Sequence, residues 1–168
     1  MQEAAKIEAA WERKYPEQVV LAITKNSEER VNLMAIGWVC IASDEPPMFL
    51  IGIDDNAYTL ELIRLHKEFV IAYPSVEMAD ATLYVGTTHG HKEDKGVRCG
   101  LKFIPADKVN VPILADAVAN FECRLVEITR PGNCPLIVGE IVASHVNADE
   151  SVKRLFTLGK GYKLGKID

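Results

Sequence analysis

Short apolar runs separated by polar or turn-forming segments dominate the chain and predict a mainly β protein. The runs that suit strands are Val19 to Thr24, Val31 to Ala42, Met48 to Ile53, Phe69 to Tyr73, Asn120 to Thr129 and Leu136 to Val146. The turn Arg130-Pro131-Gly132-Asn133 predicts that the last two runs form a hairpin. Strands follow strands with no long helix between them. This order disfavours a doubly wound parallel sheet and favours an antiparallel barrel with helical additions.

Helical spacing is confined to short segments. The clearest follows Asp54-Asp55-Asn56, residues that favour a helix N-cap, and it places Leu62, Leu65 and Phe69 on one face. The other predicted helices are Ala4 to Trp11, with a stop at Tyr15-Pro16, Glu77 to Val85 and Asp149 to Phe156. The segment Gly86 to Arg98 has no periodicity and is predicted to be a loop, and the glycine-rich end is predicted to be irregular.

Size and composition describe one globular domain spanning residues 1–168. The chain weighs 18.6 kDa, 48% of its residues are hydrophobic and 26% are charged, and its mean hydropathy is +0.03. No apolar run approaches the length that a bilayer requires, so no membrane partner is expected. The net charge of −5 argues against a general nucleic-acid binder. The first residues carry charge throughout and four cysteines show no paired spacing, so we expect a cytoplasmic protein with reduced thiols.

The common catalytic and nucleotide motifs are missing from the sequence. There is no GxGxxG, no GxxxxGK[ST], no GxSxG and no HExxH. His89-Gly90-His91, followed by acidic residues, offers only part of a metal site, and a solvated loop is the favoured interpretation, so no metal is expected. His66 is predicted to be a partly buried packing residue. His145 lies on an apolar strand, and the sequence leaves open whether it is a packing residue or a functional one. Cys40 and Cys123 are predicted to be core residues and Cys134 to be the most accessible thiol.

One arrangement points to a ligand. The run Asn32 to Trp38 contains the small residues Ala35 and Gly37, which would let a flat ligand lie against the backbone. The helix expected after Asn56 begins two elements later, and Asn56 and Thr59 would offer polar groups to an anion at its N-terminus. A planar heterocycle with a phosphate tail would fit both features.

Several fragments, in this order, resemble the flavin reductase-like, FMN-binding split-barrel proteins, which include flavoredoxin and archaeal ferric reductase. The resemblance covers roughly residues 18 to 165. The fragments are Asn32 to Trp38, Ser43 to Pro47, Asn56 to Ile63, Asp94-Lys95, Pro112-Ile113, Glu122-Cys123, Val138 to Ile141 and Gly159 to Tyr162. Each fragment is weak by itself, and their shared order carries the resemblance.

The resemblance implies a six-stranded antiparallel split β-barrel with short flanking helices that forms a homodimer and holds FMN near the subunit interface. It implies the cofactor-binding residues Asn32, Met34, Ala35, Ile36, Gly37, Trp38, Ser43, Asn56, Thr59 and Lys95. Lys95 would supply positive charge near the flavin or its phosphate, and Trp38 would pack beside the isoalloxazine ring. The alternatives are a solvated loop lysine and a core tryptophan.

The implied activity is an FMN-dependent oxidoreductase. Electrons would pass from NAD(P)H or a reduced protein donor through FMN to flavin, ferric complexes or a redox partner. The chemistry would belong to the flavin, so no catalytic side chain is assigned. A flavoredoxin-like electron carrier without a small-molecule substrate is the main alternative, and a flavin-free scaffold is a third.

Two positions depart from the family pattern. Relatives often place a basic residue just before the phosphate-binding helix, where this chain has Asp54 and Asp55. Two carboxylates there would cap the helix but repel a phosphate. The Gly-Asp-His turn of the family is here Gly132-Asn133-Cys134, which favours a changed substrate or plain electron transfer.

Overall fold

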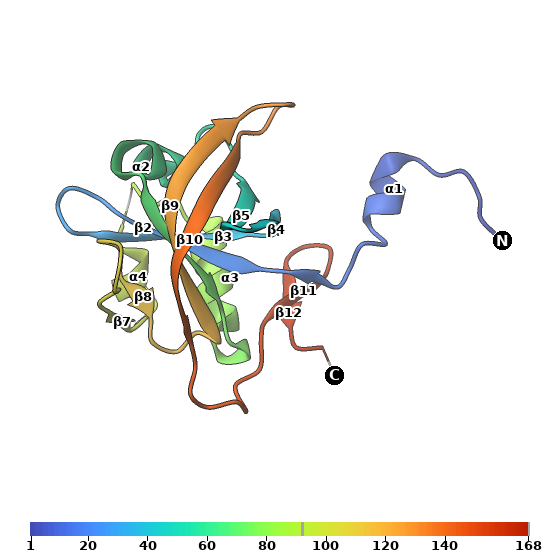
Figure 1. Ribbon diagram of the computed structural model, residues 1–168. Coiled ribbons are helices and arrows are strands. Elements are labelled where there is room, and N and C mark those ends of the chain that lie inside the picture. Colours follow the sequence, from blue (N-terminus) through green and yellow to red (C-terminus); the bar gives the residue numbers. More distant parts are fainter. Residues whose placement is uncertain (92, 168) are drawn as a thin grey trace.

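A seven-stranded antiparallel sheet is the centre of the fold (Figure 1). The computed structural model describes residues 1–91 and 93–167, with 40% strand and 18% helix. The sheet has the order β3-β2-β6-β9-β10-β5-β4, and hydrogen-bonded neighbours are antiparallel. Its strands are β2 (Val20–Lys25), β3 (Val31–Ile36), β4 (Val39–Asp44), β5 (Pro47–Gly52), β6 (Glu68–Tyr73), β9 (Ala119–Thr129) and β10 (Leu136–Val146).

The predicted class, a mainly β antiparallel fold with short flanking helices, is confirmed. The sheet has one strand more than expected because the run Val31 to Ala42 is interrupted at Gly37-Trp38 and forms both β3 and β4. Within the described residues, no backbone ladder joins β3 to β4, so the sheet is open in hydrogen bonding at this seam. The predicted hairpin of the two long runs is confirmed as β9 and β10.

Both faces of β2 are buried, which explains why its sequence is almost continuously apolar. Val20 and Ala22 belong to one core cluster, which also contains Phe49 of β5. Leu21 and Ile23 point to the opposite face and belong to a second cluster. Successive side chains of a strand alternate between faces, so a strand covered on both sides needs apolar residues at every position.

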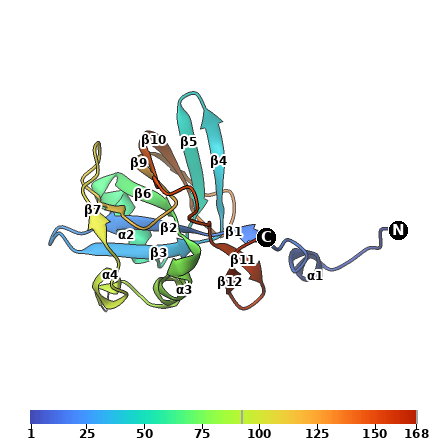
Figure 2. The same ribbon diagram turned by 90° about the horizontal axis from the view of Figure 1, so that it is seen from below.

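The helices are short: α1 (Ile7–Trp11), α2 (Tyr58–His66), the 3-10 helix η1 (Val76–Met78), α3 (Ala79–Thr87) and α4 (Lys95–Arg98). Both α3 and α4 pack against β3, as Figure 2 shows. No side chain of α1 is buried, and the helix projects away from the body of the protein (Figures 1 and 2). No helix in the described part of the chain is long and apolar enough to cross a membrane.

Several local predictions about α2 and its surroundings are wrong. The helix ends at His66 because Lys67 adopts a left-handed conformation with φ of 61°, so Phe69 belongs to β6 and is buried there. Leu65 and His66 are exposed. The predicted loop from Gly86 to Arg98 contains the end of α3 and all of α4.

The C-terminal region forms strands where a helix and an irregular end were predicted. β11 (Phe156–Gly159) and β12 (Lys163–Gly165) form a hairpin, and β1 (Glu17–Gln18) pairs with β11 to complete a three-stranded sheet. The side chain of Asp149 accepts the backbone N–H of Ser151, and no helix follows this local turn. The backbone of Leu155 then donates to Pro74, which holds this segment extended beside the end of β6. A further ribbon, β7 (Phe103–Ile104) with β8 (Ile113–Leu114), was not predicted.

Two of the three predictions about the burial of the cysteines are wrong. Cys123 is buried as expected, whereas Cys40 is exposed. Cys134 is half-buried, so it is less accessible than Cys40. Cys40 lies on β4 at the edge of the sheet, where most side chains are exposed because no layer of this chain covers them.

Candidate functional site

The edge strand β3 forms the floor of the candidate site. Asn32 and Met34 line a smaller cavity of about 330 Å³, and Met34 to Gly37 line a larger cavity of about 750 Å³. β3 pairs with β2 on one side and ends the sheet on the other. An edge strand leaves alternate N–H and C=O groups unpaired, so its backbone can bind the polar rim of a flat ligand.

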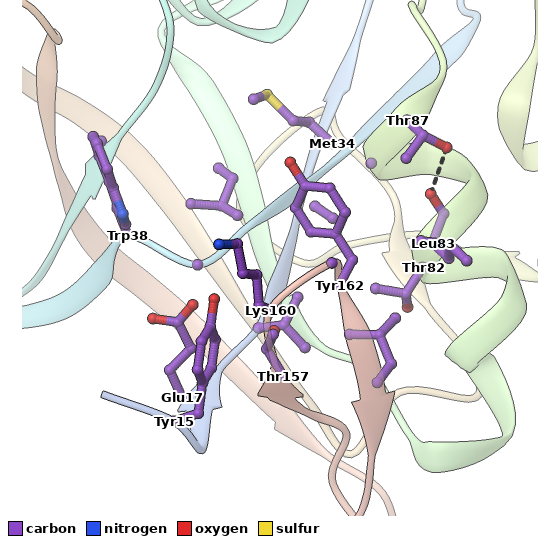
Figure 3. A pocket seen from close by; sticks show the side chains of 18 of the residues that line it. Tyr15, Glu17, Met34, Trp38, Thr82, Leu83, Thr87, Thr157, Lys160 and Tyr162 are labelled. Carbon is purple, nitrogen blue, oxygen red and sulfur yellow. Dashed lines mark hydrogen bonds between the residues drawn. The ribbon is translucent and has the colours of Figure 1, made fainter. Parts of the chain in front are cut away.

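The larger cavity lies between five segments of the chain (Figure 3). One side is formed by β3 and the following Trp38, a second by Gly52 and Asp54 at and after the end of β5, and a third by Thr82, Leu83, Gly86 and Thr87 of α3. The other two segments are the N-terminal arm, through Lys14, Tyr15 and Glu17, and the β11–β12 hairpin, through Lys160 to Tyr162. Lys14 is paired with Glu17, and Lys160 with Glu12, so glutamates of the arm balance both lysines.

Trp38 is a wall of the larger cavity and not a core residue. Its side chain is 57% exposed. It lies against Gly52, where an added Cβ would be 3.1 Å from Cε3 of the indole. Glycine at this position therefore lets the side chain of Trp38 pack closely against the end of β5. The core interpretation of Trp38 is wrong, and the indole remains available to a ligand.

The two cavities meet at residues that line both: Met34, Asp54, Gly86 and Thr87. A Cβ on Gly86 would lie 3.0 Å from the Cβ of Ala35, so α3 approaches β3 as closely as it does because residue 86 has no side chain. A ligand that fills both cavities would pass Gly86.

The N-terminus of α2 faces the smaller cavity without a side-chain cap. The predicted cap residues have other partners: Asp54 accepts the backbone N–H of Asn56 at 2.9 Å, and Asp55 is paired with Arg130. The N-cap residue of α2 is Ala57, whose side chain cannot accept a hydrogen bond. The amide of Leu60 already donates to the carbonyl of Ala57 at 2.9 Å, whereas no partner among the described residues is found for the amides of Tyr58 and Thr59. Unpartnered amides of this kind make a helix N-terminus a binding place for anions.

Asn32 fastens the floor of the site to α2. It is 4% exposed, and its amide donates to Oγ1 of Thr59 at 2.9 Å and to Oγ1 of Thr24 at 3.1 Å. An added Cβ on Gly90 would lie 2.0 Å from Oδ1 of Asn32, so only glycine lets this loop close over the amide. The role of Asn32 in the structure is to hold β3, α2 and the loop together.

Lys95 is the buried cation of the site. It begins α4 and is 3% exposed, so the interpretation as a solvated loop lysine is wrong. Its Nζ donates to the carbonyl oxygens of Val85 and Thr88, at 3.0 Å each. An ammonium has three N–H donors, and within the described residues no third acceptor is found. Burial lowers the pKa of Lys95 to about 8.

The structure brings together almost every predicted binding residue. Asn56, Thr59 and Lys95 line the smaller cavity together with Asn32. The members of the run Met34 to Trp38 line the larger cavity. Ser43 lines neither cavity, because it lies on β4 opposite Met48 of β5.

Sequence reasoning missed the contributions of the arm and of α3. The arm is separated from β3 in sequence and reaches the cavity only because β1 pairs with β11. For the hairpin a signal existed, since Gly159 to Tyr162 was one of the family-like fragments. For α3 the only signal would have been Gly86, whose meaning depends on its contact with Ala35.

Two other groups of polar side chains have a structural explanation. The carboxylate of Glu122 is fully buried and accepts the backbone N–H groups of Asp107, Lys108 and Val109 as well as His145 Nε2 at 2.6 Å. Burial by itself raises the pKa of Glu122, but these hydrogen bonds outweigh it and the pKa is lowered. Asp107, Glu122 and His145 each have an atom that could bind a metal ion, and these atoms lie within 4.8 Å of one another. The carboxylate of Glu122, however, already accepts hydrogen bonds from the three backbone N–H groups and from His145.

The segment with His89 and His91 packs on α2. The ring of His91 lies 4.0 Å from that of Tyr58, measured between centroids, and its Nε2 is 3.9 Å from Glu61. His89 lines the smaller cavity. The segment is therefore part of the wall of the site.

Comparison with known proteins decides the family. Residues 12–164 match the flavin reductase-like domain. The chain belongs to this family. An uncharacterized protein of Archaeoglobus fulgidus is 34% identical over 154 residues, which cover 92% of this chain and 79% of that protein. The resemblance inferred from the sequence fragments is thus confirmed.

Solved structures place this flavin reductase-like chain among proteins of the same fold. It is similar to flavoredoxin from Methanosarcina acetivorans, with a TM-score of 0.86 and 26% identity over 99% of this chain and 92% of that chain. It is also similar to an FMN-binding protein from Thermus thermophilus with bound p-hydroxybenzaldehyde. For that structure the TM-score is 0.83 and the identity 26%, over 99% and 94% of the two chains. The fold matches that of split-barrel flavin reductases.

Proposed function

We propose that this flavin reductase-like protein is an FMN-dependent oxidoreductase. It would pass electrons from NAD(P)H or a reduced protein donor through bound FMN to flavin, ferric complexes or a redox partner. The family assignment and the similarity to an FMN-binding protein of Thermus thermophilus support the cofactor. The two joined cavities carry the proposal, because one end suits a phosphate and the other suits a flat ring.

The phosphate end is the smaller cavity. The amides of Tyr58 and Thr59 in the first turn of α2 and the third N–H of the Lys95 ammonium are donors that would bind phosphate oxygens. Lys95 is held by two carbonyls, so its ammonium is fixed in place before a ligand arrives. The cavity thus combines a rigid cation with an uncapped helix end, which is what an anion site requires.

The ring end is the larger cavity. The free edge of β3, from Met34 to Gly37, would hydrogen-bond the polar rim of the isoalloxazine, and Trp38 would lie beside the ring. The ribityl chain that joins ring and phosphate would pass Gly86, which lines both cavities. FMN supplies the redox chemistry when bound, and these residues bind it, orient it and limit its exposure to water.

The lining of the larger cavity is compatible with an enzyme that takes a second ligand. Its volume of about 750 Å³ lies within the about 300–1,000 Å³ that sites for small ligands typically enclose, and its wall extends beyond β3 to the arm and the hairpin. Tyr15 and Tyr162, at the arm and the hairpin, would be the contacts for this second ligand. The flavoredoxin-like carrier is retained as the second function because of the similarity to the Methanosarcina flavoredoxin.

A homodimer is part of the proposal. Three large apolar side chains are well exposed: Ile41 on β4 at 69%, Val126 on β9 at 51% and Trp38, between β3 and β4, at 57%. A second copy that covered such side chains would remove them from water. Light scattering at micromolar concentration checks this expectation, and a species of 18.6 kDa as the sole component would reject it.

The cofactor test uses the purified protein and its apo form. We expect a yellow protein that releases FMN and not FAD on denaturation, and an apo form that binds FMN in calorimetry. A colourless protein that shows no binding of added FMN would refute the proposal.

The enzyme and the carrier are separated by the electron donor. Stopped-flow mixing with NADH or NADPH should bleach the flavin of an enzyme and sustain turnover with free flavin or ferric chelates. Slow bleaching by both nucleotides, together with fast bleaching by a reduced iron–sulfur protein, would instead support the carrier.

A further inference from the structure

The turn between β9 and β10 reaches across to the start of α2 through Arg130. The guanidinium of Arg130 forms a two-pronged ion pair with Asp55: Nη1 donates to Oδ1 at 2.9 Å, and Nη2 donates to Oδ2. Nη2 also donates to the carbonyl oxygen of Asn133 at 3.2 Å, which fixes the guanidinium against its own turn. Paired N–H donors of arginine match the two oxygens of a carboxylate, so this pair has a defined orientation.

Further contacts dock the same turn onto the segment that leads into α2. The backbone N–H of Ile53 donates to Pro135 at 3.2 Å, and Sγ of Cys134 donates to the carbonyl of Ile53 at 3.1 Å. The position of Asp55 relative to the turn is thus fixed by contacts that do not depend on Arg130. A substitution at Arg130 should change the charge around Asp55 more than the path of the backbone.

The charge of Asp55 matters because of where it lies. Asp55 lines neither cavity, but it is the chain neighbour of Asp54, which lines both, and it comes three residues before Tyr58, the first residue of α2. A phosphate at the N-terminus of α2 would carry close to two negative charges at neutral pH, and a free carboxylate nearby would repel it. The sequence shows this conflict, and the structure shows a cation from a distant segment placed against one of the two carboxylates.

We propose that Arg130 is a positioning residue for the phosphate of FMN: by pairing with Asp55 it neutralises that carboxylate and turns it toward the β9–β10 turn. The proposal rests on the proposed function, since it assumes that FMN is the ligand. The arginine supplies positive charge to the start of α2 from the turn between β9 and β10. It acts through Asp55 and not by contact with the ligand.

The test is a double-mutant cycle with two ligands. Arg130→Gln, Asp55→Asn and the double variant are prepared as apo proteins, and the dissociation constants of FMN and riboflavin are measured at about 0.01 M and about 1 M salt. Arg130→Gln should weaken FMN binding roughly threefold to tenfold at low salt, as expected for exposed charge pairs, and less at high salt. Riboflavin has no phosphate, so its affinity should not change.

The double variant gives the decisive result. If Arg130 acts by neutralising Asp55, removing both charges should restore FMN binding to within about twofold of the Asp55→Asn protein. FMN binding that stays as weak in the double variant as in Arg130→Gln would overturn the proposal. So would an Arg130→Gln protein that binds FMN like the wild type, or one that loses riboflavin equally. A wild-type protein that binds neither ligand would refute the proposed function, and this inference with it.

Discussion

Replacement of Lys95 by methionine should separate the phosphate contact from the stability of the fold. Methionine has a similar length and keeps the apolar stem packed, but it removes the ammonium. A charge-assisted hydrogen bond to a phosphate oxygen contributes about 1.5–3 kcal/mol. We therefore expect Lys95→Met to weaken FMN binding by roughly tenfold to a hundredfold. Arg98→Met is the matched control, because Arg98 is exposed on the same helix and should leave the affinity unchanged.

The pH dependence sharpens this prediction. Burial lowers the pKa of Lys95 to about 8, so the apo protein loses the ammonium as the pH rises through that value. A bound phosphate would favour the charged form and raise this pKa, so FMN binding takes up a proton above pH ~8. The affinity of the wild type should therefore fall from pH ~8 toward pH ~10, and Lys95→Met should show no such fall.

The stability of the apo protein changes with pH in the opposite direction from the FMN affinity. The pKa of Lys95 is lower in the folded protein than the usual value of about 10.4 in an unfolded chain. The unfolded state thus binds more protons between these values, and the contribution of Lys95 to the stability of the apo protein rises with pH in this window. Titration of FMN into the apo proteins, followed by flavin fluorescence, measures the affinity, and thermal unfolding measures the stability. If Lys95→Met binds FMN as tightly as the wild type at pH 7 and keeps its pH profile, Lys95 does not contact the phosphate.

Three further substitutions test other parts of the site and fold. Trp38→Ala should weaken FMN binding by roughly twofold to tenfold, which is the contribution of one aromatic contact. It should barely change the unfolding temperature of the apo protein, because Trp38 is 57% exposed, and an unchanged FMN affinity would exclude the contact. Gly86→Val should weaken FMN binding by more than about tenfold, because even an added Cβ would lie 3.0 Å from the Cβ of Ala35 and valine adds two more methyl groups. Calorimetry measures the FMN affinity, and an affinity equal to that of the wild type would place the ligand elsewhere. Glu122→Gln should lower the unfolding temperature by roughly 5–10 °C, since the side-chain amide N–H groups would then face backbone N–H groups. The FMN affinity should stay the same, and an unchanged melting curve would show that the segment from Asp107 to Val109 is stable without the carboxylate.

The sequence determined the class of the fold and the inner wall of the site. Alternation and apolar runs depend on local spacing, so the strands of the main sheet could be predicted without knowing their partners. The small residues Ala35 and Gly37 marked the strand that lines the cavities. The order of the family-like fragments then identified the family.

Other features depended on contacts between distant segments. Nothing near Asp149 in the sequence shows that Leu155 donates to Pro74, so a helix was predicted where the chain is held extended. Lys95 resembled a solvated residue because its two carbonyl partners come from the end of α3 and the loop after it. Burial is a property of the packed structure, and it cannot be derived from a polar stretch without periodicity.

The charge around α2 shows the same division most clearly. From the sequence, Asp54 and Asp55 could be interpreted only as helix caps that repel an anion. The structure assigns one carboxylate to an Asx turn with Asn56 and the other to Arg130, 75 residues away in sequence. Electrostatic interaction depends on distance in space and not along the chain, so the sequence determined which charges are present and the tertiary structure decided which of them an anion would meet.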